Sequence, residues 1–139
     1  MLVQLIFASQ ARQSCAATIQ AILAQGRARN AQRGITGVLC HGYGVYIQAM
    51  EGERSAVNDS YAQVLRDERH EGVQLLHFAE IDERRFANWA LGQVKLEALT
   101  PSWVLKYAER LPLTPQQFNA RSVQAMMLDL VATGSVAHQ

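Results

Sequence analysis

Three groups of side chains in this sequence have the types and spacing to bind a ligand. The first is Arg29, Asn30 and Arg33, just after the first expected helix. Residues four apart share a helix face, so Arg29 and Arg33 point the same way if the helix continues this far. An asparagine amide offers a donor and an acceptor, which suits a heterocycle whose edge carries both. On the residues alone, a solvated helix end with arginines near its C-terminal dipole is favoured.

The second candidate is a glutamine in the middle of an otherwise apolar strand. Gln48 lies within Val45-Tyr46-Ile47-Gln48-Ala49-Met50, and strand alternation places it on the same face as Tyr46 and Met50. A buried glutamine must satisfy up to four hydrogen bonds or cost free energy. The residues leave two interpretations open: an exposed position, or a buried amide with a polar partner.

The third candidate is Trp89, which follows Arg84-Arg85-Phe86-Ala87-Asn88 and precedes a glycine by three residues. A tryptophan at such a position most often packs in a core or an interface, although it can also lie against an aromatic cofactor. The sequence has no Ser/His/Asp set, phosphate-loop glycine pattern or paired carboxylates. Cys15 and Cys40 stand apart, and no histidine lies at ligand spacing from them. We therefore predict neither an enzyme nor a metal site.

The composition predicts a folded chain with a local charge bias. Its 139 residues are 49% hydrophobic and 18% charged, with a net charge of +1, which argues against disorder and against a broadly cationic nucleic-acid binder. The first fifty residues hold four arginines and no acidic side chain, so an anionic ligand is attracted to that half. We find neither a signal peptide nor an apolar run of about 18 residues. We expect a cytoplasmic protein without nucleic-acid or membrane partners.

The apolar periodicity predicts the order β-α-β-β-α-β followed by one more strand. The expected elements are a strand over Leu2–Ser9, a helix capped by Ser14 and ended by Gly26, a hairpin turning at 41–44, a helix spanning Val57–Leu65, a strand over Val73–Phe78 and a strand over Trp89–Leu96. This is the ferredoxin-like α+β arrangement, in which two helices cover one face of the sheet.

Two further helix starts follow the last strand. Thr100-Pro101 and Thr114-Pro115 each place a cap residue before a proline at the first helical position. We therefore divide the chain into a domain over residues 1–97 and a C-terminal helical extension over residues 98–139.

Five segments then occur in the order expected of a known family. They are Leu5-Ile6-Phe7-Ala8-Ser9, Asn30-Ala31-Gln32-Arg33-Gly34-Ile35-Thr36-Gly37, Ile47-Gln48-Ala49-Met50-Glu51-Gly52, Arg66-Asp67-Glu68-Arg69-His70 and Arg84-Arg85-Phe86-Ala87-Asn88-Trp89. Together they resemble the BLUF family, blue-light sensors that use FAD. The resemblance runs from about Leu2 to Leu96 and implies a short, stand-alone member that holds the isoalloxazine ring between its two helices, against the sheet.

The resemblance also implies roles for individual residues. Asn30 is expected to bind the polar edge of the ring, and Gln48 to hydrogen-bond near its N5 and O4 atoms. Arg69, with Asp67 and His70 nearby, corresponds to the family position close to the C2 carbonyl. The other implied ring neighbours are Arg29, Ile35, Trp89 and Leu91, the last standing where a methionine is common.

One departure from the family pattern affects the expected photochemistry. The family's first strand carries a tyrosine that hydrogen-bonds the glutamine and supplies an electron and a proton to the photoexcited flavin. Here the strand reads Phe7-Ala8-Ser9, and phenylalanine has no hydroxyl to do either. FAD binding is expected to survive because the cavity shape is nearly preserved, whereas the usual photoswitch is expected to be impaired or absent.

The expected function is light signalling through protein contacts. The outer side of the sheet, with Met126 and Met127 on the last helix, predicts a homo-oligomer, and an unidentified downstream protein is the expected partner. The alternative is a light-inert protein-interaction module on the same fold. A small acyl-phosphate hydrolase is a weaker alternative that rests on fold analogy alone.

Overall fold

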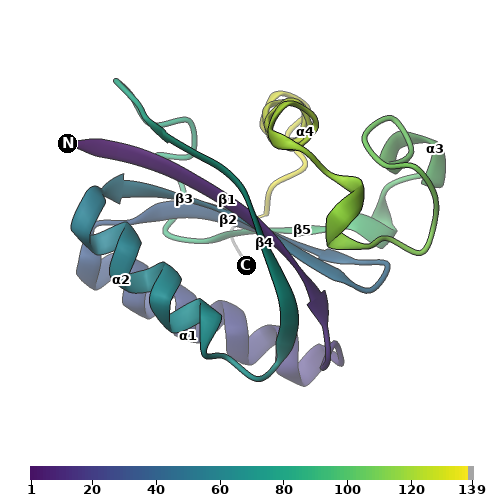
Figure 1. The fold of residues 1–139 in the computed structure, drawn as a ribbon, viewed down its shortest axis with the longest axis horizontal. Helices are drawn as coiled ribbons and strands as arrows, with labels where there is room; N and C mark the ends of the chain where they lie inside the picture. Colours follow the sequence, from purple (N-terminus) through teal and green to yellow (C-terminus); the bar gives the residue numbers. More distant parts are fainter. Residues whose placement is uncertain (138–139) are drawn as a thin grey trace.

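The computed structural model of the protein describes residues 1–137 and contains a five-stranded sheet with helices on both faces (Figure 1). In chain order the elements are β1 (Leu2–Ala11), α1 (Ala16–Arg33), β2 (Thr36–Gly42), β3 (Val45–Glu53), α2 (Arg54–Leu65), β4 (His70–Glu80), β5 (Gly92–Lys95), the 3-10 turn η1 (Leu96–Ala98), α3 (Pro101–Val104), the 3-10 turn η2 (Pro115–Gln117) and α4 (Ala120–Ala132).

The strand order is β4-β1-β3-β2-β5, which confirms the predicted ferredoxin-like fold with a fifth strand. β1 pairs antiparallel with both β3 and β4, and β2 pairs antiparallel with β3. The added strand β5 pairs parallel with β2. The first strand of the chain is therefore interior to the sheet, and β5 forms one edge.

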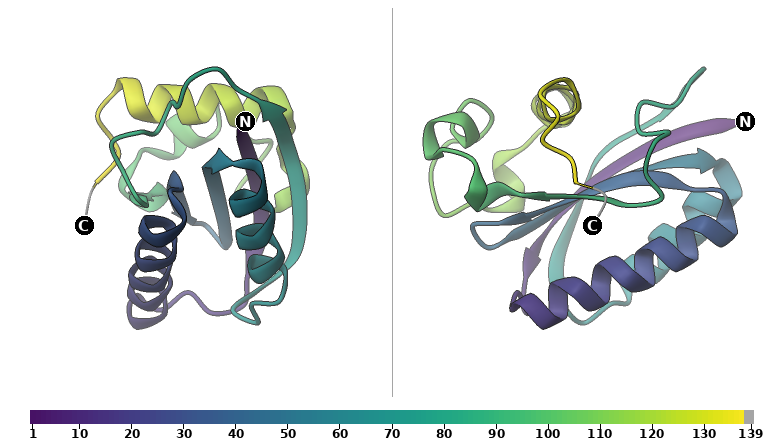
Figure 2. Two further views of the ribbon diagram at one scale, coloured as in Figure 1. Left: turned by 90° about the vertical axis from the view of Figure 1, so that its left-hand side faces the viewer. Right: turned by 180° about the vertical axis from the view of Figure 1, so that it is seen from behind.

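The two faces of the sheet are buried by different helices. α1 and α2 lie side by side along one face, and α4 crosses the opposite face (Figure 2). Alternating residues serve the two sides: Leu5, Phe7 and Met50 pack with Val57 of α2, whereas Ile6 and the next alternate residues pack beneath α4. This alternation follows from the two-residue period of a strand.

The β2–β3 hairpin turns where the sequence predicted it. Tyr43 and Gly44 occupy the two loop positions with φ values of 53° and 91°, as a type I′ turn requires. The turn sets the pairing of Cys40 with Ile47 and of Leu39 with Gln48, so it fixes which face Gln48 occupies.

The predicted bounds of the first helix are wrong at both ends. Cys15 rather than Ser14 is the N-cap residue, and no side chain caps this end. The helix runs past Gly26 to Arg33 and ends at Gly34, whose φ of 67° is the left-handed C-cap conformation. Gly26 instead allows close packing, because a Cβ there would lie 2.6 Å from Cδ2 of Leu91. The longer helix keeps Arg29, Asn30 and Arg33 within α1.

The C-terminal segment also differs from its prediction. Thr100-Pro101 does begin α3, with the Thr100 side chain accepting a hydrogen bond from the Trp103 backbone, but α3 is only four residues long. Thr114-Pro115 begins only the 3-10 turn η2. The longer helix α4 starts at Ala120, where Asn119 and Ser122 form a reciprocal capping box. The domain boundary between residues 97 and 98 stays a prediction, and residues 138 and 139 lie outside the described part.

The prediction of an open sheet face with exposed methionines is wrong. Met126 and Met127 are each 1% exposed because α4 turns them toward the sheet, where they pack with Ile6, Cys40 and other core residues. α4 thus covers the apolar sheet face that was expected to be open. This face therefore no longer supports the prediction of a homo-oligomer. Among residues 1–137, no helix is both long and apolar enough to cross a membrane.

A buried carboxylate anchors the loop between β4 and β5. Glu51 is fully buried on β3 and accepts hydrogen bonds from Nε2 of Gln4 at 2.7 Å, from the Arg85 backbone N–H at 2.9 Å and from the Phe86 backbone N–H at 2.8 Å. Arg84 donates to the Gly34 carbonyl at 2.9 Å and to Thr36 Oγ1 at 2.8 Å. These bonds fix the start of the loop that carries Trp89 and Leu91.

Candidate functional site

A cavity lies between α1 and α2 on the sheet face that those helices cover. The sheet forms its floor, and the segment joining α2 to β4 closes one side. Its lining residues are Phe7, Ile22, Arg29, Leu39, Tyr46, Gln48, Val64, Asp67, Arg69 and His70. Six of them are predicted ligand or photoswitch residues, so the structure brings together most of the site that the resemblance implied.

Gln48 and Phe7 face each other across the cavity floor. They are direct cross-strand partners in the β1–β3 ladder. The Gln48 side-chain amide makes no hydrogen bond with any residue among 1–137, whereas the Phe7 ring, 1% exposed, packs 5.7 Å from the Tyr61 ring and 6.2 Å from the His70 ring. An amide with unused donors and acceptors therefore borders the cavity beside an aromatic ring that has no hydroxyl.

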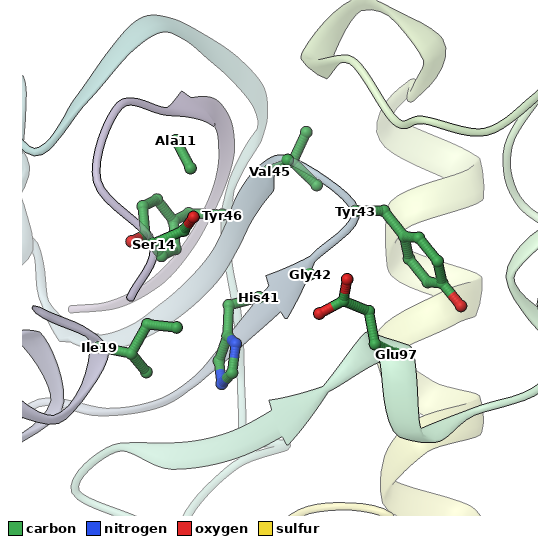
Figure 3. Close-up of a pocket in the computed structure, with 10 residues that line it drawn as sticks. Ala11, Ser14, Ile19, His41, Gly42, Tyr43, Val45, Tyr46 and Glu97 are labelled. Carbon is green, nitrogen blue, oxygen red and sulfur yellow. The ribbon is translucent and has the colours of Figure 1, made fainter. Parts of the chain in front are cut away.

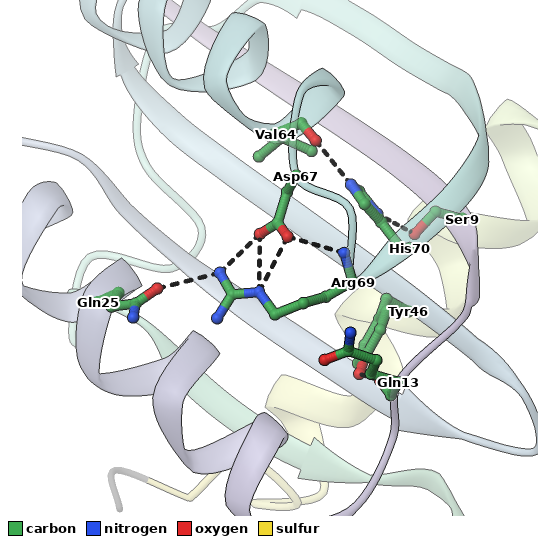
Figure 4. Close-up of polar contacts among 8 residues, drawn as sticks. All are labelled: Ser9, Gln13, Gln25, Tyr46, Val64, Asp67, Arg69 and His70. Atoms are coloured by element: carbon green, nitrogen blue, oxygen red, sulfur yellow. Dashed lines mark hydrogen bonds and ion pairs between the residues drawn. The ribbon is translucent and has the colours of Figure 1, made fainter.

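Tyr46 also lines the cavity, two residues before Gln48 on the same strand face. Its hydroxyl donates to the Gln13 backbone carbonyl, and its ring lies 6.5 Å from that of His70 (Figure 4). Burial raises the pKa of Tyr46, which keeps the phenol protonated at neutral pH. Its hydroxyl is thus committed to the β1–α1 connection and not to Gln48.

Arg69 spans the cavity from the α2–β4 side to α1. Its guanidinium binds both carboxylate oxygens of Asp67, at 2.9 and 2.6 Å, and donates to Oε1 of Gln25 on α1 at 3.0 Å (Figure 4). The hydrogen bonds from Arg69 lower the pKa of Asp67, and the same pair raises the pKa of Arg69. A bidentate arginine–carboxylate pair of this kind is a specific, charge-assisted contact.

His70 connects the cavity wall to β1. Its Nε2 lies 2.6 Å from the Val64 carbonyl oxygen, and its Nδ1 lies 2.6 Å from Oγ of the fully buried Ser9. A carbonyl can only accept, so Nε2 carries the proton, and in the neutral ring Nδ1 accepts from the Ser9 hydroxyl. Both ring nitrogens are engaged, and His70 offers the cavity only its ring face and edge.

The remaining predicted site residues lie outside the cavity lining. Asn30 is 3% exposed, and its Nδ2 donates to the Ala90 carbonyl at 2.7 Å. Ile35 belongs to the core cluster that contains Phe7. Leu91 packs with Leu23 and Leu39 on the α1 side.

Trp89 is on the opposite side of the sheet from Leu91. It packs, partly buried, against the core beneath α4, and its carbonyl accepts from the Gly37 backbone N–H at 3.0 Å. Of the predicted photoswitch residues, Phe7 and Gln48 therefore line the cavity, whereas Leu91 and Trp89 do not.

The sequence reasoning missed several residues that shape this site. Ile22, Leu39 and Val64 line the cavity, and Ser9 and Gln25 orient His70 and Arg69. Leu39 had a readable signal, because the hairpin register pairs it with Gln48 across β2 and β3. Gln25 had none, because its contact partner lies 44 residues away in the sequence.

A second, separate cavity of about 80 Å³ lies at the end of the β2–β3 hairpin (Figure 3). Ser14, His41 and Glu97 contribute its polar groups, and Tyr46 forms a wall between it and the first cavity. No three histidine, cysteine, aspartate or glutamate side chains in the described residues are grouped so that they could hold a metal ion.

The fold and this cleft define a ferredoxin-like domain with a ligand site between two helices. A sequence model of the BLUF family, described as sensors of blue-light using FAD, matches residues 2–92. The chain belongs to the BLUF family, and FAD is the cofactor of that family.

Known relatives agree with this assignment. The beta subunit of a photoactivated adenylate cyclase from Euglena gracilis is 37% identical over 82 residues, which are 58% of this chain and 10% of that protein. The chain thus spans about a tenth of the curated relative. The photo-activated state of BlsA superimposes with a TM-score of 0.82 at 26% identity, covering 94% of this chain and 95% of that one. The dark state of BlrB gives 0.78 at 28% identity, covering 96% of both.

The residues of the cleft fit an isoalloxazine ring in chemical type. Ile22, Leu39 and Val64 offer apolar contacts to the faces of a flat ring, and the unpartnered Gln48 amide offers both donors and an acceptor to its polar edge. The cavity itself holds only about 40 Å³, and Arg69 reaches across it to Gln25. We expect the Arg69 side chain to move aside when a ring enters between the helices.

Replacing Asp67 with asparagine tests the Arg69 bridge. Because the folded pKa of Asp67 is lowered, its stabilising contribution is full above pH ~5 and is lost as the pH falls below ~3.9 through the folded pKa. We expect Asp67→Asn to lower the free energy of unfolding by about 0.5–1 kcal/mol at pH 7, with a smaller difference from wild type at pH ~2.5. Urea unfolding at both pH values measures this. Exposed Asp82→Asn is the control, and an equal loss at both pH values contradicts the assignment.

Proposed function

We propose that this chain binds FAD in the cleft between α1 and α2 and acts in blue-light signalling, with an impaired photoswitch. The observation that carries the proposal is the pairing of Phe7 with an unpartnered Gln48 at the cavity floor. The amide suits the flavin edge, while the hydroxyl that normally holds this glutamine and reduces the excited flavin is replaced by a C–H group.

In this proposal the chain's own residues position the cofactor. Gln48 hydrogen-bonds the ring near N5 and O4, Arg69 and Asp67 face the C2 side, and Arg29 lies beside the ring. Asn30 reaches the polar edge once its Nδ2 leaves the Ala90 carbonyl. When bound, the flavin supplies the blue-light absorption. The chain itself carries out no catalysis in this proposal and works in the cytoplasm through contacts with another protein.

The absorption spectrum before and after illumination tests the proposal. We expect purified protein to be yellow and to release close to one FAD per chain on denaturation. Blue light is expected to leave no lasting red shift of the flavin bands. Colourless protein that does not take up added FAD contradicts cofactor binding, and a stable light-induced shift contradicts the impaired switch.

A light-inert interaction module on the same fold is the second candidate. Phe7 also favours this candidate, because a flavin bound beside Phe7 would lack the tyrosine that the usual photoswitch requires. The FAD content of the purified protein separates the two, since the inert module is expected to hold none.

A further inference from the structure

The outer edge of β5 already accepts a strand in this structure. The Gln93 backbone N–H donates to the Ala137 carbonyl at 2.7 Å, and the Ala137 N–H donates back to the Gln93 carbonyl at 2.8 Å. This antiparallel bridge stands alone, outside the regular strands. The chain descends from α4 to the sheet to make it (Figure 2). Because strand residues alternate, the backbone groups of Lys95 point to the same edge as those of Gln93.

Gly92 gives the incoming strand room on the α4 side. A Cβ at Gly92 would lie 2.4 Å from Cγ1 of Val136 and 3.1 Å from Cγ of Trp89. Val136 therefore packs over the glycine and joins the core beneath α4. The edge accepts a branched apolar side chain at this place, next to the loop residue Trp89.

The other side of the same edge is a cationic groove. A cavity of about 520 Å³ is lined by Gln20 and Arg27 of α1, by Gln93 and Lys95 of β5, and by Leu99 and Ser135 among others, with no acidic side chain in its lining. Arg27 donates from Nε to the Leu91 carbonyl at 3.0 Å, and its buried Nη2 has no partner in the described residues. Glu97 lines an adjoining cavity together with Lys95, but no acidic side chain within residues 1–137 forms an ion pair with Arg27 or Lys95.

The chain's own 135–137 segment hydrogen-bonds the backbone of this edge, but it does not compensate the positive charges of Arg27 and Lys95. Its residues Ser135, Val136 and Ala137 carry no carboxylate. We propose that the β5 edge binds an extended segment of a partner protein, with a branched apolar residue at the place of Val136 flanked by acidic residues, in exchange for the chain's own 135–137 segment. Backbone hydrogen bonds give affinity in such strand addition, and the alternating side chains give specificity. The biological role of this binding rests on the proposed signalling function, but the binding itself requires neither flavin nor light.

Peptide binding to the intact chain tests this inference. The probes are fluorescein-labelled GTEVET and its lysine counterpart GTKVKT, followed by fluorescence anisotropy, and the FAD content is recorded separately. We expect saturable binding of GTEVET only. We expect Lys95→Gln to weaken it about two- to five-fold, which is the effect of one exposed ion pair. Equal binding of both peptides, or of neither at about 1 mM, overturns the proposal.

A substitution in the tail tests the exchange. Ala137→Pro removes the N–H that bonds Gln93 and is expected to tighten GTEVET binding about five-fold, the effect of one net hydrogen bond. Exposed Ala137→Ser keeps the N–H and is expected to bind like wild type. Unchanged affinity in Ala137→Pro contradicts the exchange. In wild type, amide hydrogen exchange at Lys95 is expected to slow when GTEVET is added, and an unchanged rate contradicts pairing along this edge.

Discussion

Phe7→Tyr is expected to give the FAD-loaded protein a lasting red shift of its flavin absorption under blue light, where wild type is expected to show none. Phe7 is the direct cross-strand partner of Gln48, and both border the cavity. A phenol at this position places a donor beside an amide that has no partner among the described residues, and in the proposed function it supplies the missing electron and proton. The change is from no detectable shift to a switch of full amplitude.

The controls for this prediction separate the position from the added phenol. Phe78→Tyr makes the same chemical change on β4, at a side chain 38% exposed, and is expected to leave the spectrum unchanged. The double variant Phe7→Tyr with Gln48→Ala is expected to lose the restored shift. A Phe7→Tyr protein that holds FAD and stays unchanged under light would show that another part of the pocket is also defective.

Glu51→Gln is expected to lower the free energy of unfolding by about 2–4 kcal/mol. The carboxylate is fully buried and accepts from Gln4 and from the backbone N–H groups of Arg85 and Phe86. A glutamine of equal size replaces one accepting oxygen with an NH₂ group, which faces donors it cannot satisfy. Urea unfolding measures the loss, and the exposed Glu71→Gln is the matched control with an expected change below about 0.5 kcal/mol. Equal effects of the two variants contradict the anchoring role of Glu51.

The fold was predictable because its signals are local. The mostly apolar runs of β1 and β3, the hairpin turn at Tyr43-Gly44 and the Thr100 cap are each readable within a few residues. The predictions were wrong where a segment distant in the sequence determines the local structure. Gly26 reads as a helix end, but it is a contact point for Leu91, and Met126 and Met127 read as exposed only if α4 is not known to cross the sheet.

The candidate site was predictable in its residue types and less so in its geometry. Gln48 was marked by its apolar neighbours, and its strand face followed from alternation. The engagement of Asn30 with the Ala90 carbonyl and of Arg69 with Gln25 links residues 60 and 44 apart, and no sequence spacing shows such pairs. The position of Trp89 beneath α4 likewise depends on a helix that begins only at Ala120.

The interior position of β1 has a consequence for how the protein assembles during synthesis. β1 leaves the ribosome before both of its neighbours in the sheet, β3 and β4, so its pairing with β4 is incomplete until residue 80 has emerged. The wall that His70 forms with Ser9 closes only at that stage. Pairings between such distant segments form slowly because the intervening chain must first be ordered. The cleft that would receive the flavin is therefore completed late in folding, and we expect cofactor loading to follow the closure of the β1–β4 pair.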